Sequence, residues 1–119
     1  MRTVLLFLVA CIALPLVAQS PEKPPQSAVD ARVKAYVAGL SDGNEGSNEY
    51  TFVEVSNSEY TLVKAGHWRV KAAFTMHVSN FSIDGFEPYT QQGFLSFDLV
   101  KNEAGAWQAP AETIRYSKE

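Results

Sequence analysis

A stretch of regular alternation in the middle of the chain constrains the fold most. From Trp68 to Val78 every second residue is apolar, and the residues between them are mostly polar. Because side chains alternate between the two faces of a strand, this pattern predicts a long strand with one buried and one solvated face. Such half-buried strands are typical of antiparallel sheets. The apolar set is Trp68, Val70, Ala72, Phe74, Met76 and Val78.

A helix is expected before the strands. Ser27 can cap its first turn, with Asp30 three residues later. The apolar residues that follow recur at helical spacing and form one stripe along a helix of about thirteen residues. They are Val29, Val33, Tyr36, Val37 and Leu40.

The other strands are marked by apolar runs and turn residues. Runs at 50–55 and 60–65 flank polar residues 56–59, which predicts a hairpin. A strand is expected over 94–100, and a last one over 107–116, where Pro110 marks a bulge or an edge. The order predicts an α+β fold, with one N-terminal helix packed on a curved antiparallel sheet of about four to five strands.

This order of elements, over 27–116, resembles the cystatin-like and NTF2-like group of small α+β folds. The Gln-x-Val-x-Gly motif of the cystatin inhibitory loop is absent, since Val37-Ala38-Gly39 lacks the glutamine. The resemblance therefore implies a fold and brings no expectation of protease inhibition. Its NTF2-like branch implies a small enzyme with a pocket between helix and sheet as an alternative function.

The first eighteen residues have the order of a secretory signal peptide. Arg2 is followed by an apolar stretch of about fourteen residues and then by small Ala18. The stretch is shorter than the roughly 18 residues expected of a membrane span. The sequence therefore predicts a signal peptide at 1–18, a proline-rich linker at 19–26 and one domain at 27–119. We expect the mature protein to be exported to the periplasm or secreted.

Cys11 offers a different interpretation of the same segment. Leu8-Val9-Ala10-Cys11 matches the lipobox of bacterial lipoproteins, in which the cysteine is acylated. In that alternative Cys11 is a lipidation site and the domain is tethered to a membrane. In the signal-peptide interpretation Cys11 is removed, and the mature domain has no cysteine and depends on its hydrophobic core.

Charge and motifs exclude several classes of function. Without Arg2 the chain has nine basic residues against 13 acidic ones, a net charge near −4, which disfavours nucleic acid as a partner. There is no Gly-x-Ser-x-Gly elbow, phosphate loop or dinucleotide fingerprint. The histidines, His67 and His77, lie too far apart on one strand to share a metal ion. We expect no catalytic residues, metal or cofactor.

Two surfaces remain as candidates for binding a partner. The segment 80–92 is longer than a tight hairpin needs and carries Phe81, Phe86 and Tyr89, which suit recognition if they are exposed. The polar face of the central strand carries Arg69, Lys71 and His77, a basic stripe that suits an acidic partner. The sequence thus favours an exported, non-catalytic module that binds a protein or a small apolar ligand, such as an inhibitor, an immunity-type protein or an accessory of the cell envelope.

Overall fold

The computed structural model describes residues 21–42 and 48–118. The predicted signal peptide at 1–18, with Cys11, and residues 19–20 lie outside this part of the chain. Its elements are α2 (Gln26–Asp42), β1 (Glu49–Lys64), β2 (His67–Ser79), β3 (Tyr89–Lys101), β4 (Trp107–Gln108), the 3-10 helix η1 (Ala111–Thr113) and β5 (Arg115–Lys118). In the described part, no helix is long and apolar enough to cross a membrane.

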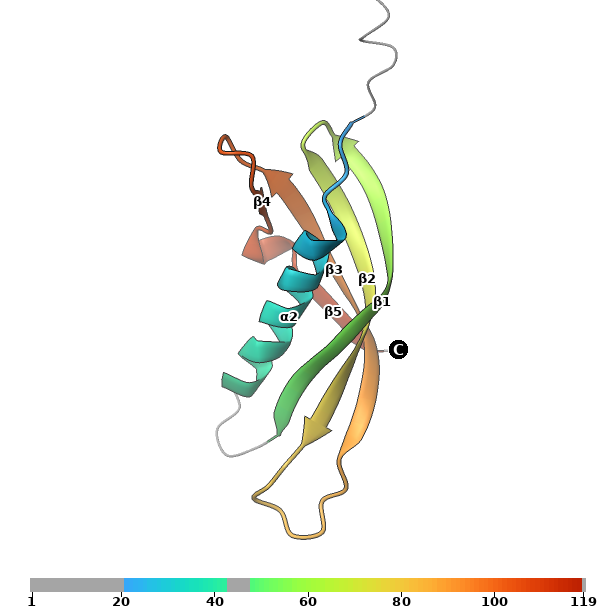
Figure 1. Cartoon of the computed structure of the whole chain (residues 1–119), viewed down its shortest axis with the longest axis vertical. Coiled ribbons are helices and arrows are strands. Elements are labelled where there is room, and N and C mark those ends of the chain that lie inside the picture. Colours follow the sequence, from blue (N-terminus) through green and yellow to red (C-terminus); the bar gives the residue numbers. More distant parts are fainter. Residues whose placement is uncertain (1–20, 43–47, 119) are drawn as a thin grey trace, which may run out of the picture.

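One helix packs against an open antiparallel sheet of five strands, which confirms the predicted α+β class (Figure 1). The strands β1, β2 and β3 form a meander, and both β4 and β5 pair with β3. The predicted long strand is β2, and it pairs along its whole length with β1 and β3. Its alternating apolar residues are all buried, as are Leu95, Phe97 and Leu99 on β3.

Helix α2 is held by the predicted apolar stripe. Val29, Val33 and Val37 are at most 1% exposed and belong to the same core as the apolar face of the sheet. Tyr36 and Leu40 are partly buried at its margin. The helix begins at Gln26, one residue before the expected cap, and Gln26 donates a hydrogen bond to Asp30 over 2.9 Å.

The expected hairpin at 50–65 is wrong, because β1 is one strand of 16 residues. The polar residues 56–59 continue the pairing with β2, in which Ser58 lies opposite Ala72. Irregularities between Phe52 and Glu54, between Val55 and Asn57, and beyond Leu62 absorb the extra residues as bulges. Since β1 is an edge strand, polar residues there cost little, and bulges protect its free edge.

The single last strand expected over 107–116 is also wrong. Pro110 lacks an N–H for the sheet and precedes η1, so the chain leaves β3 after β4 and rejoins it as β5. The side chain of Thr113 donates to the carbonyl of Pro110 over 2.7 Å and stabilises this turn. The chain turns after β3, where the side chain of Asn102 accepts a hydrogen bond from the backbone N–H of Ala106.

The described part of the proline-rich segment, residues 21–25, lies against the domain. Trp68 donates its indole N–H to the carbonyl of Glu22 over 2.8 Å, and Lys101 pairs with the Glu22 carboxylate. Pro24 is buried. The chain is therefore fastened to the end of the sheet where β1 turns into β2 before α2 begins (Figure 1).

Candidate functional site

The loop between β2 and β3, residues 80–88, is the most prominent candidate. We call it the tip loop, because it projects beyond the sheet at the end opposite residues 21–25 (Figure 1). Phe81 is 84% exposed and Ile83 is 53% exposed. The loop therefore exposes two large apolar side chains, and the contact of such side chains with water is unfavourable.

Polar contacts at its base hold the tip loop in this shape. Asn80 is only 7% exposed, and its side-chain oxygen accepts hydrogen bonds from the backbone N–H and the hydroxyl of Ser82. Its amide nitrogen donates to the side chain of Asn48 over 3.1 Å. Gly85 has a φ of 80°, a conformation that glycine adopts without strain. The apolar residues are thus presented by a loop that is fastened at its base.

The three aromatic residues predicted for this surface have different positions. Phe81 points away from the core, whereas Phe86 is half-buried and packs against the core cluster. Tyr89 opens β3, is 46% exposed, and its ring lies 6.2 Å from that of Phe86. Phe86 therefore anchors the loop, Phe81 and Tyr89 are accessible, and Ile83 joins the exposed set.

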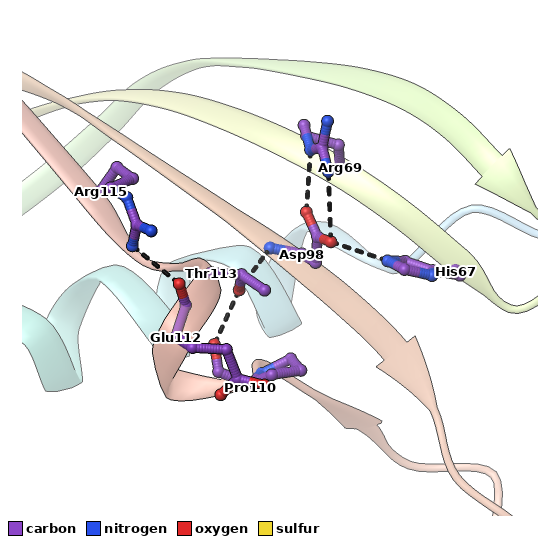
Figure 2. A network of polar contacts seen from close by, with 7 residues as sticks. All are labelled: His67, Arg69, Asp98, Pro110, Glu112, Thr113 and Arg115. Carbon is purple, nitrogen blue, oxygen red and sulfur yellow. Dashed lines mark hydrogen bonds and ion pairs between the residues drawn. The ribbon is translucent and has the colours of Figure 1, made fainter.

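The predicted basic stripe consists of three residues in different environments. Arg69 donates to Asp98 through Nε over 3.0 Å, so its charge is balanced within the fold (Figure 2). Lys71 lies with its ammonium 4.7 Å from the ring centre of Phe94. His77 is half-buried, and no described residue forms an ion pair with it. The structure brings Arg69 and Lys71 to one face but engages both within the domain.

Asp98 is the feature that sequence reasoning missed. Its carboxylate is nearly buried and also contacts His67, with 2.8 Å between Nε2 and Oδ2 (Figure 2). The backbone N–H of Asp98 donates to the hydroxyl of Thr113 over 3.1 Å. Hydrogen bonding from Arg69 holds the pKa of Asp98 below its usual range, and His67 acts in the same direction, while burial opposes both. This cluster joins β2, β3 and η1 and stabilises the fold.

We expect Asp98→Asn to lower the free energy of unfolding by about 1 to 3 kcal/mol at neutral pH, because a charge-assisted buried contact is lost. The folded-state pKa is depressed, so this stabilisation is complete above the unfolded pKa of about 4 and disappears as pH falls below it. Urea unfolding at pH 6 and pH 3 should therefore show a smaller difference between the two proteins at pH 3. A difference that does not change with pH would contradict the ion-pair assignment.

Within residues 21–42 and 48–118, no group of three or more His, Cys, Asp or Glu side chains lies in a position to hold a metal ion. Comparison with protein-family models, with curated proteins and with solved structures gives no match to this chain.

Proposed function

We propose that this chain is an exported, non-catalytic binding module that recognises a protein partner through its tip loop. The observation that carries the proposal is the 84% exposure of Phe81 on a loop that Asn80 and Phe86 fasten to the domain. The side chain of such a phenylalanine is exposed in the free protein, so most of its surface becomes buried only when a partner binds. Little conformational entropy is lost, because the loop already has its shape.

The composition of the tip loop fits a protein interface. Interfaces bury a small apolar centre within a polar rim, and a few aromatic anchors supply most of the affinity. We assign Phe81 and Ile83 to such a centre. Tyr89, whose ring contacts Phe86 of the same loop, adds a ring that offers both an apolar face and a hydroxyl. Asp84 and Glu87, both exposed, supply polar groups at its edge.

The arrangement of the domain also suits presentation of this loop. The chain joins the domain at the opposite end of the sheet, where Glu22 contacts Trp68 and Lys101 (Figure 1). If Cys11 is lipidated, the tether attaches at that end, and the tip loop is directed away from the membrane. If a signal peptide is removed instead, the same loop is free in the exported compartment.

Replacement of Phe81 and Ile83 together by serine is expected to weaken partner binding by about a hundredfold or more, since two central apolar anchors are lost. Stability should change by less than about 1 kcal/mol, because both side chains are exposed. The partner is first isolated from native extract with the unaltered protein and identified by mass. Its affinity for each variant is then measured with purified components.

The matched control is the double variant of Val53 and Val63 to serine. These residues are 50% and 47% exposed on β1, so the control removes two exposed apolar side chains from outside the tip loop. It should bind the partner as the unaltered protein does. Equal affinity of both double variants would refute the proposal.

A further inference from the structure

A second feature, unconnected with the tip loop, is a groove between α2 and the chain that follows β3. Its hollow has a volume of about 670 Å³. One wall consists of the helix residues Ala28, Ala31 and Ala35, and the other of residues 107–110. Leu99 and Val100 of β3 also line it. Small alanines on the helix keep the groove open, because larger side chains at these positions would fill it.

Arg32 gives this groove its chemical character. It lies on α2 among the alanines, and its Nε is shielded from solvent without a hydrogen-bond partner in the described part of the chain. The arginines on the sheet side differ, because Arg69 pairs with Asp98, and Arg115 donates to the carbonyls of Glu112 and Ile114. Arg32 therefore brings to the groove a positive charge that no described residue balances in an ion pair.

We propose that the groove binds a small amphiphile with a single carboxylate head and an apolar body, such as a medium-chain fatty acid. The planar guanidinium of Arg32 matches a carboxylate, which would accept hydrogen bonds from it and balance its charge. The alanine wall, Leu99 and the ring of Trp107 would cover the apolar body. The volume lies within the roughly 300 to 1,000 Å³ found for small-molecule sites.

The composition of the lining favours this ligand over a polyanion or a neutral lipid. Arg32 is the one charged residue in the lining, and its other polar side-chain groups are the amide of Gln108 and the indole N–H of Trp107. A phosphate-rich ligand would need several cations, whereas one guanidinium suffices for one carboxylate. A neutral chain would fill the apolar part and leave the charge of Arg32 unbalanced.

Three probes with the same ten-carbon chain test the head group: decanoate, decanol and decyltrimethylammonium, each below its micelle concentration. Binding is followed by the fluorescence of Trp107, which lines the groove, and Trp107→Phe should remove the signal. Decanoate is expected to bind about ten- to hundredfold more tightly than decanol. The cationic probe should bind most weakly. Equal binding of decanoate and decanol would overturn the carboxylate assignment.

Two pairs of variants test the residues. Arg32→Gln should weaken decanoate binding by about ten- to hundredfold and leave decanol unaffected, while Lys34→Gln, an exposed change on the same helix, should alter neither. Ala35→Leu should block all three probes, and Ala38→Leu, outside the groove, should block none. Thermal unfolding of each variant checks the fold. Unchanged decanoate affinity in Arg32→Gln, or in Ala35→Leu, would overturn the site.

Discussion

Phe74→Ala is expected to lower the free energy of unfolding by about 3 to 5 kcal/mol, a large part of the roughly 5 to 15 kcal/mol that holds a domain of this kind together. Phe74 is 1% exposed at the middle of β2, and with Phe97 it is the largest fully buried side chain in the described part of the chain. Its ring also meets that of Tyr116 edge-on at 6.2 Å, which connects β2 to β5. Truncation leaves a cavity between these strands that the sheet cannot close.

The measurement is urea unfolding followed by circular dichroism. Phe74→Leu is the matched control, since leucine retains much of the apolar volume and should cost clearly less than alanine. A loss below about 1 kcal/mol in Phe74→Ala would mean that the residue does not fill the core.

Val33→Asp is expected to detach α2 from the sheet and to cost more than about 4 kcal/mol, because an unpaired charge would be buried in the helix–sheet interface. Val33 has no exposed surface, and its neighbours in the core are Val29, Val37 and the apolar face of β2. Loss of the docked helix would also abolish the groove that contains Arg32.

Ala38→Asp introduces the same charge at an exposed position of the same helix. It should lower stability by less than about 1 kcal/mol. Circular dichroism and urea unfolding of Val33→Asp and Ala38→Asp compare the buried and the exposed face of the helix. Similar losses in the free energy of unfolding would show that the buried face is assigned wrongly.

The fold was predictable where one physical signal dominates. Alternation over β2 and helical spacing in α2 each reflect burial of one face, and both elements form as expected. Residues 56–59 were misleading, because their polarity is typical of a turn but is tolerated on the edge strand β1. Near the end of the chain, one strand was expected over 107–116. The structure instead has two short strands on either side of Pro110, and both pair with β3, which the local sequence does not reveal.

The candidate sites were less predictable, because they depend on contacts between distant residues. The tip loop was recognisable from its length and aromatic content, but only three-dimensional packing shows that Phe86 turns inward and Phe81 outward. The contact of Arg69 with Asp98 depends on the register of β2 and β3, which the sequence pattern leaves open. An acid within the apolar strand 94–100 was the one local signal for this cluster.

The Arg32 groove shows the same limit. Alanines on one helix face look like ordinary helix formers in the sequence. Their role in keeping a hollow open emerges only once residues 107–110 are placed opposite them. The arginine among them is informative because it lines the groove and no described residue forms an ion pair with it.

Photo-crosslinking at position 81 tests the central proposal most directly. A benzoyl-phenylalanine is placed at position 81 in one protein and at position 63, on the exposed part of β1, in another. Both are produced in the native cells and irradiated. We predict one dominant protein adduct from position 81 that is absent from position 63. The same adducts from both positions, or none from position 81, would contradict recognition by the tip loop.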